Sequence, residues 1–118
     1  MREPIAVSHA CVPAAFPTII PGCEVLAIAG LGKTIREFGT LPAVAATDLG
    51  RRLLQENPSA DAIFLPSPHW PTAAALEPLE RAVGVAAMSA LQAFAWDALR
   101  LVGVTDRIDG YGRLLRDF

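Results

Sequence analysis

Apolar runs of strand length alternate with helical patterns along this chain of 118 residues, and this alternation constrains the fold more than any other feature. The plainest run is residues 61–65, Asp-Ala-Ile-Phe-Leu, which is apolar without interruption after its first residue. Such runs are typical of parallel strands whose two faces are both buried. Strands that alternate with helices predict parallel βαβ units with right-handed crossovers.

The same alternation predicts the position of each element. We expect strands at residues 4–8, 24–29, 61–65 and 85–88, helices at 41–56, 72–83 and 92–102, and one helical turn at 34–38. Residues 1–118 are therefore expected to form a single α/β domain with a small four-stranded parallel sheet flanked by helices, of flavodoxin-like character. The start, residues 1–22, is divergent, because Pro13, Pro17 and Pro21 preclude a continuous helix there.

The helical patterns also predict which side chains are buried. Pro78 lies inside the helix expected at 72–83 and should break or kink it. The first long helix should turn inward a face made of Val44, Leu49, Leu53 and Leu54. The last should bury a face marked by Ala95, Trp96, Leu99 and Val102.

Composition and charge exclude several classes of function. The hydrophobic content of 53% has two possible causes, a sheet buried on both faces and an exposed apolar surface that binds a partner, and we expect both here. The net charge is −2 and no cluster of Lys or Arg occurs, so the footprint of nucleic-acid binding is missing. The longest apolar stretch, residues 84–104, contains Asp97 and Arg100, which disfavour membrane insertion. With no signal-peptide layout at the start, we expect a cytoplasmic protein.

Cysteine and histidine usage predicts no metal site. Cys11 and Cys23 are expected to be free thiols in a cytosolic protein, and their spacing matches neither a zinc nor a redox motif. His9 and His69 are far apart and have no companion at ligand spacing.

In a sheet of this kind, ligands bind beyond the carboxyl ends of the strands. Three loops should meet at that edge, namely residues 9–12, 66–72 and 89–92. The candidate functional residues therefore come from these loops.

From Ala60 onward the sequence resembles the C-terminal half-domain of the maleate isomerase and arylmalonate decarboxylase branch of the Asp/Glu racemase superfamily. The resemblance rests on the order and spacing of several short motifs. They are Asp61–Phe64, Thr72, Leu76–Glu80, Gly84, Ser89, Gln92–Ala93, Trp96–Arg100 and Gly110–Leu114. Residues 23–59 fit the pattern only loosely, and residues 1–22 fit it least.

This resemblance implies a cofactor-independent protein that acts on small carboxylates such as maleate or arylmalonates. Members of the branch have two similar α/β domains facing each other across a cleft, and they use a cysteine as nucleophile or proton donor. The present chain resembles one half. The other half would then come from a second copy, forming a homodimer with Ser67 of each copy facing across the cleft, or from a partner domain.

Ser67 occupies the position of the catalytic cysteine in this resemblance, and two interpretations stand. As a catalytic residue, its hydroxyl would need an adjacent base, and His69 lies two residues away. As a structural residue, it would cap a turn or the following helix.

The remaining candidates are substrate-binding residues. Thr72 begins a helix whose free N–H groups can accept a carboxylate, or it is a simple N-cap. Ser89 and Gln92 match the loop that lines the cleft, and Cys11 lies near a ligand-facing position, although a buried structural role is also open. Leu91 replaces an asparagine usual in maleate isomerases, which puts affinity for dicarboxylates in doubt.

Two functional hypotheses follow. The first is an isomerase- or decarboxylase-like protein acting on small carboxylates. The alternative is a catalytically inactive, shortened relative that keeps the fold and ligand binding.

Overall fold

The computed structural model describes residues 3–9, 23–66 and 69–118. The strands and long helices follow in the order that the sequence predicts, and a short C-terminal helix that was not predicted comes after them. The elements are β1 (Glu3–His9), β2 (Cys23–Gly30), α1 (Ile35–Phe38), α2 (Ala43–Glu56), β3 (Ala62–Leu65), α3 (Ala73–Val83), β4 (Ala86–Ser89), α4 (Ala90–Leu101) and α5 (Arg113–Asp117). Among these helices none is long and apolar enough to cross a bilayer.

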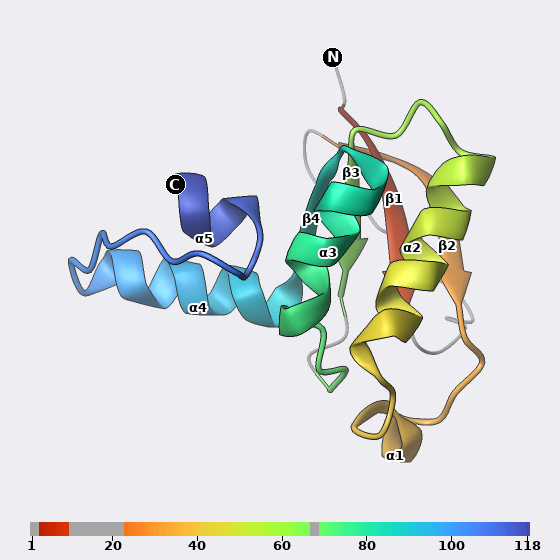
Figure 1. Ribbon diagram of the computed structural model, residues 1–118, viewed down its shortest axis with the longest axis horizontal. Coiled ribbons are helices and arrows are strands. Elements are labelled where there is room, and N and C mark those ends of the chain that lie inside the picture. The colour runs from red at the N-terminus through yellow and green to blue at the C-terminus, as the bar shows by residue number, and fades with distance from the viewer. Residues whose placement is uncertain (1–2, 10–22, 67–68) are drawn as a thin grey trace.

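The four strands form one parallel sheet in the order β2-β1-β3-β4 (Figure 1). The predicted fold class, a four-stranded parallel α/β domain, is confirmed. The sheet grows outward from β1 in both directions. The chain adds β2 on one side of β1, and then β3 and β4 on the other side. All strands end at the same edge, which is called the carboxyl edge below.

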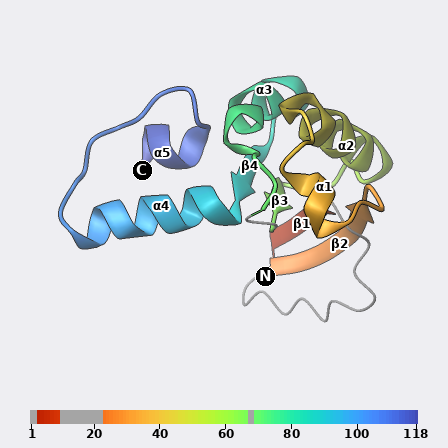
Figure 2. The same cartoon turned by 90° about the horizontal axis from the view of Figure 1, so that it is seen from below.

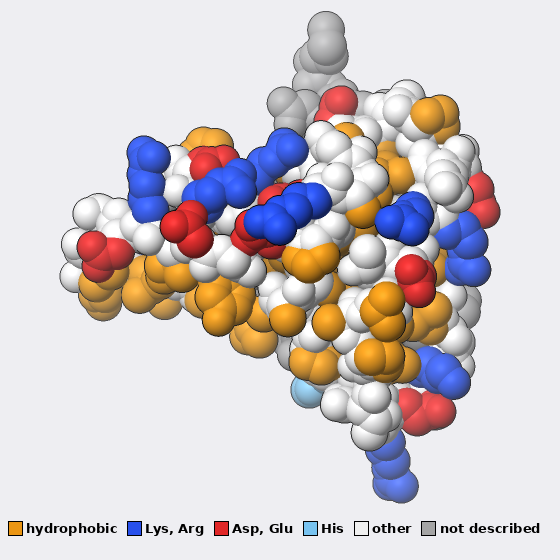
Figure 3. All heavy atoms as spheres, in the orientation of Figure 1, with side chains coloured by type: hydrophobic (Ala, Val, Ile, Leu, Met, Phe, Trp, Pro, Cys, Tyr) orange, Lys and Arg blue, Asp and Glu red, His pale blue; other side chains and the backbone are white. Residues whose placement is uncertain are grey.

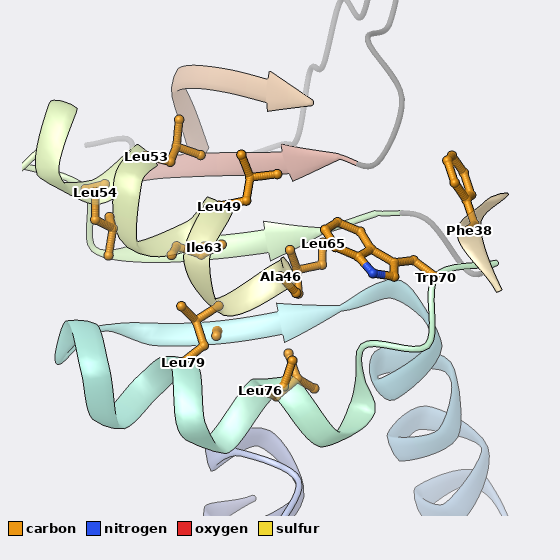
Figure 4. Close-up of a cluster of buried hydrophobic side chains, with 13 residues drawn as sticks. Phe38, Ala46, Leu49, Leu53, Leu54, Ile63, Leu65, Trp70, Leu76 and Leu79 are labelled. Atoms are coloured by element: carbon orange, nitrogen blue, oxygen red, sulfur yellow. The ribbon is translucent and has the colours of Figure 1, made fainter. Parts of the chain in front are cut away.

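Helices α2 and α3 cover one face of this sheet (Figure 2). Ile63 and Leu65 on β3 and Ala87 on β4 point to that face and are buried, whereas their neighbours along each strand are less buried. Gly50 lets α2 pack closely against α3, since a Cβ at this position would lie 2.9 Å from Cδ1 of Leu79 on α3. Figure 4 shows the resulting core, in which leucines from α2 and α3 lie over β3.

The opposite face of the sheet is less completely buried. Phe64 is half-buried, and Ile28 and Met88 are 39% and 38% exposed. Parallel sheets are normally covered on both faces. The expectation that every strand is buried on both faces is therefore wrong for β3 and β4, where burial alternates from residue to residue.

Of the two outcomes expected at Pro78, a break or a kink, the break does not occur, because α3 runs from Ala73 to Val83 with Pro78 inside it. Proline removes one backbone hydrogen bond and costs about 3 kcal/mol in a helix interior. Leu76 and Leu79 are fully buried on either side of Pro78. Their packing against the sheet offsets the local cost.

The chain divides into a body, residues 3–89, and an arm, residues 90–118, that projects from the body at the carboxyl edge (Figure 1). The arm consists of α4, α5 and the segment between them. Its first helix leaves the sheet instead of packing across it, and its main contacts are with β4 and α5.

The predicted buried face of the last helix is therefore wrong. Val102 is 76% exposed, Ala95 is exposed, and Trp96 and Leu99 are only half-buried. Gln92 is the buried residue of α4. A helical period identifies an apolar stripe, but it does not say whether another element covers that stripe. For the same reason Val44, predicted to face inward from α2, is 57% exposed.

Candidate functional site

The carboxyl edge brings together the last residue of β4 and the first residues of α3 and α4 (Figure 1). Ser89, at the end of β4, is in register with Leu65, at the end of β3. Thr72, Ser89 and Gln92 are all buried, at 2%, 1% and 5% exposure. Buried polar side chains at this edge are placed where parallel α/β sheets bind ligands.

Thr72 stands at the N-cap position of α3, but its side chain makes no capping hydrogen bond. Its backbone N–H donates to Trp70 O at 2.8 Å, and its carbonyl accepts the N–H of Ala75 at 2.8 Å. The first N–H groups of a helix have no intrahelical acceptor. The start of α3 is therefore a polar position with both a hydroxyl and helix N–H groups to offer an anion.

Ser89 and Gln92 form a capping box at the start of α4. The backbone N–H of Gln92 donates to Ser89 Oγ at 3.1 Å, and the N–H of Ser89 donates to Gln92 Oε1 at 3.4 Å. The amide nitrogen of Gln92 donates to the carbonyl of Tyr111. These two side chains thus have a structural role that the sequence pattern Ser-x-x-Gln could have indicated.

The loop that follows β3 contains one exposed and one buried ring. His69 is exposed. Trp70 is 1% exposed and lies in the core, where Figure 4 shows its indole beside Leu65 and Ala46. Trp70 is therefore a packing anchor of the core, and its Nε1 has no hydrogen-bond partner within the described residues.

Two candidates, Ser67 and Cys11, lie outside the described residues. Among the residues that are described, no three His, Cys, Asp or Glu side chains lie close enough to hold a metal ion.

A carboxylate on the carboxyl side of β2 is already engaged. Glu37 Oε2 accepts the backbone N–H of Thr34 at 2.7 Å and the Thr34 hydroxyl at 2.8 Å. These hydrogen bonds hold the pKa of Glu37 below its ordinary value. Both hydrogen bonds stabilise the ionised carboxylate, so Glu37 is poorly suited to act as a base. The role of its side chain is to cap the start of α1.

Sequence reasoning missed Glu80, a buried carboxylate that joins the arm to the body. Glu80 is 5% exposed, and its two oxygens accept the backbone N–H groups of Ala87 and Arg113, each at 3.0 Å. Its position beside Leu76 and Leu79 on the apolar face of α3 could have revealed it, since acidic residues on such a face need partners.

A cavity of about 540 Å³ lies at the opposite edge of the sheet. It is lined in part by Ala60 and Val85, which precede β3 and β4, and by Arg51 and Gln55 of α2. It is therefore separate from the carboxyl edge, where the candidate residues gather.

Comparison with known proteins assigns this arrangement to a family. The family model for arylmalonate decarboxylase matches residues 19–115. The chain belongs to the arylmalonate decarboxylase family. The match begins well before Ala60, so the loosely fitting residues 23–59 are part of the family domain as well. A search of the curated proteins found no match.

Solved structures of the arylmalonate decarboxylase family have the same fold. The crystal structure of an arylmalonate decarboxylase is 28% identical, with a TM-score of 0.83, over 96% of this chain and 53% of that chain. A double mutant of arylmalonate decarboxylase in a liganded form is 27% identical, with a TM-score of 0.84, over 99% and 53% of the two chains. This chain spans about half the length of the solved structures it matches.

A maleate isomerase shares the fold too. The Nocardia farcinica maleate cis-trans isomerase, as a mutant with a covalently bound succinylcysteine intermediate, is 24% identical, with a TM-score of 0.82. That comparison covers 98% of this chain and 49% of the isomerase. The branch recognised from the motifs at residues 61–114 is therefore confirmed.

Proposed function

We propose that this chain is an arylmalonate decarboxylase-like protein that binds a small dicarboxylate at the carboxyl edge of its sheet and acts on it without a cofactor. The observation that carries the proposal is the family match over residues 19–115, joined to buried polar groups at that edge. Decarboxylation of a malonate releases CO₂ and leaves an enediolate, which must be stabilised and then protonated.

The described residues are better suited to stabilise the enediolate than to protonate it. Thr72 and the first N–H groups of α3 can hold a carboxylate or an enediolate oxygen, because the Thr72 side chain makes no capping hydrogen bond and a helix N-terminus favours an anion. Ser67 is our candidate for the group that faces the reacting carbon, with His69 as its proton-transfer partner. A serine hydroxyl is far less acidic than a thiol, so Ser67 gives its proton to the carbon slowly unless a protonated His69 replaces that proton on the Ser67 oxygen.

We further propose that the active form contains a second α/β half, supplied by a second copy of the chain. The remaining candidates, Ser89, Gln92 and Cys11, are assigned to lining the cleft and contacting substrate. We also propose that the protein is located in the cytoplasm.

A specific observation favours the alternative, an inactive relative that keeps the fold and ligand binding. The hydrogen-bonding groups of Ser89 and Gln92 are already used in the capping box and at Tyr111. Leu91, at the start of the same helix, offers no polar group. Fewer donors are then left for a second carboxylate.

Proton NMR of the purified chain with phenylmalonate, and separately with maleate, tests the proposal. Phenylacetate or fumarate that appears with the wild type and not with Ser67→Ala supports an enzyme and assigns Ser67 to its site. Ser67→Cys should increase the rate, because a thiol restores a more acidic proton donor. If neither the wild type nor Ser67→Cys converts substrate while chemical-shift changes at Thr72 report binding, the inactive alternative holds.

A further inference from the structure

An apolar stripe runs along the outer side of α4 and its C-cap, and nothing in the described structure covers it. It is called the α4 stripe and consists of Leu91, Phe94, Ala95, Ala98, Leu101 and Val102. Its four large side chains are 53–79% exposed. Figure 3 shows apolar side chains in a row along the lower side of the arm.

The stripe is a defined face of the helix. At about 100° per residue its members fall within an arc of about 120°, which is the width of a face that normally packs on a core. The other side of α4 is held in place by hydrogen bonds. Gln92 donates to Tyr111 O, and Arg100 donates to Val104 O at 2.8 Å. These contacts place the side of α4 away from the stripe against the C-terminal segment.

Four of the six residues of the stripe are symmetric about its centre, and Phe94 and Leu101 lie together on one flank. Large residues, Leu91 and Val102, lie at the two ends, and the small residues Ala95 and Ala98 lie in the middle. A two-fold axis through the middle of α4 places Leu91 opposite Val102 and Ala95 opposite Ala98. Small residues at the centre allow two helices to approach closely. A surface that matches itself in this way is what a two-fold dimer requires.

We propose that the α4 stripe is the docking surface for a second copy of this chain, with the two α4 helices packed antiparallel about a two-fold axis.

The area available matches a dimer of modest affinity. With one aromatic and three large aliphatic side chains, the stripe exposes roughly 600 Å² of apolar surface, at the upper end of the largest patch on a typical monomer. Two copies would bury about 1,200 Å² together, which is the lower limit for a specific interface. The dimer should therefore dissociate on dilution.

The docking has a consequence for the candidate site. The stripe begins at Leu91, directly after the carboxyl edge, and the lower side of the arm in Figure 3 is the side where the strands of Figure 1 end. A second copy on the stripe would lie beside Ser89 and Gln92 and help to close the site. This consequence rests on the proposed function, whereas the docking itself is tested without substrate.

Sedimentation velocity over a range of concentrations tests the docking. The wild type should shift from 12.5 kDa toward twice that mass as its concentration rises. Phe94→Glu and Leu101→Lys, both at exposed positions that tolerate a charge in the folded monomer, should each raise the dissociation constant at least about 30-fold. Val44→Glu, at a 57% exposed position on α2, is the matched control and should leave the dimer intact.

Cross-linking tests the antiparallel geometry. A mixture of Leu91→Cys and Val102→Cys chains, oxidised and mapped by mass spectrometry, should give the 91–102 linked peptide and little 91–91 or 102–102 product. A wild type that stays monomeric at several hundred micromolar, a dimer that survives both charge substitutions, or a growing ladder of oligomers would each overturn the proposal. None of these outcomes depends on whether the chain turns over a substrate.

Discussion

The body and the arm carry apolar helical stripes of similar period, yet only those of the body are covered. Leu76 and Leu79 on α3 are fully buried against β3, whereas Leu101 on α4 is 79% exposed. Burial in the body is shared among helices α1, α2 and α3 and strands β2, β3 and β4, so the core side chains there have neighbours on several sides. The arm is joined to the body by the hydrogen bonds of Glu80 and by little apolar burial, of which Leu115, 7% exposed, is the main part. Apolar packing thus stabilises the body more than it stabilises the arm.

The largest test of this difference compares leucines of the two regions. Leu79→Ala should lower the free energy of unfolding by about 2–5 kcal/mol, because it leaves a cavity in the core. Leu101→Ala should change it by less than about 0.5 kcal/mol in the monomer. Urea denaturation, followed by circular dichroism at a concentration below that of dimer formation, measures both. Equal effects would mean that the arm is covered in the monomer too.

The polar attachment of the arm is tested at Glu80. Glu80→Leu removes the acceptor for the N–H groups of Ala87 and Arg113 and should cost about 1–3 kcal/mol for each buried donor left unpaired. Amide hydrogen exchange should accelerate at Arg113 and Ala87 while Leu49 and Leu53 in the core stay protected. Glu56→Leu, at an exposed position near the end of α2, is the control. Unchanged protection at Arg113 would contradict the role of Glu80.

Two glycines in the arm allow the cost of steric crowding to be measured apart from the cost of a left-handed backbone conformation. Gly112 has a φ of +88°, and a Cβ there would lie 3.2 Å from Gln92 Nε2. Gly103 has a similar φ of +84° but open space around it. Gly103→Ala should cost about 1–2 kcal/mol from the left-handed conformation alone. Gly112→Ala should lower the free energy of unfolding by more than this. The difference, measured by urea denaturation, is the cost of the contacts that the new Cβ makes with Gln92, Glu80 and Leu76. Equal costs would show that Gln92 moves aside freely.

The smallest expected effect compares the starts of α3 and α4. Ser89→Ala removes a capping hydrogen bond and should destabilise the chain by about 1 kcal/mol. Thr72→Val keeps the volume of a side chain that makes no capping bond and should change stability by less than about 0.5 kcal/mol. The same substitution should weaken phenylmalonate binding, measured by calorimetry, if the Thr72 hydroxyl contacts the ligand. Strong destabilisation by Thr72→Val would point to a structural role instead.

Much of the fold could be predicted from the sequence, since each element depends on local patterns. The alternation of apolar runs and helical periods gave every strand and long helix within a few residues, and short motifs after Ala60 identified the family. The candidate site was predictable only as a set of loops. Thr72, Ser89 and Gln92 do gather at the carboxyl edge, but the capping box that engages two of them depends on side-chain geometry.

The sequence by itself determined the parallel α/β fold, the position of the carboxyl edge and the family, because periodicity and residue spacing are properties of the chain alone. Only the tertiary structure decided that α4 leaves the sheet, that Pro78 is tolerated inside α3, and that Glu80 joins the arm to the body. Each of these depends on what packs against a side chain from a distant part of the sequence. An apolar stripe looks the same in a sequence whether it faces a core, solvent or a second copy.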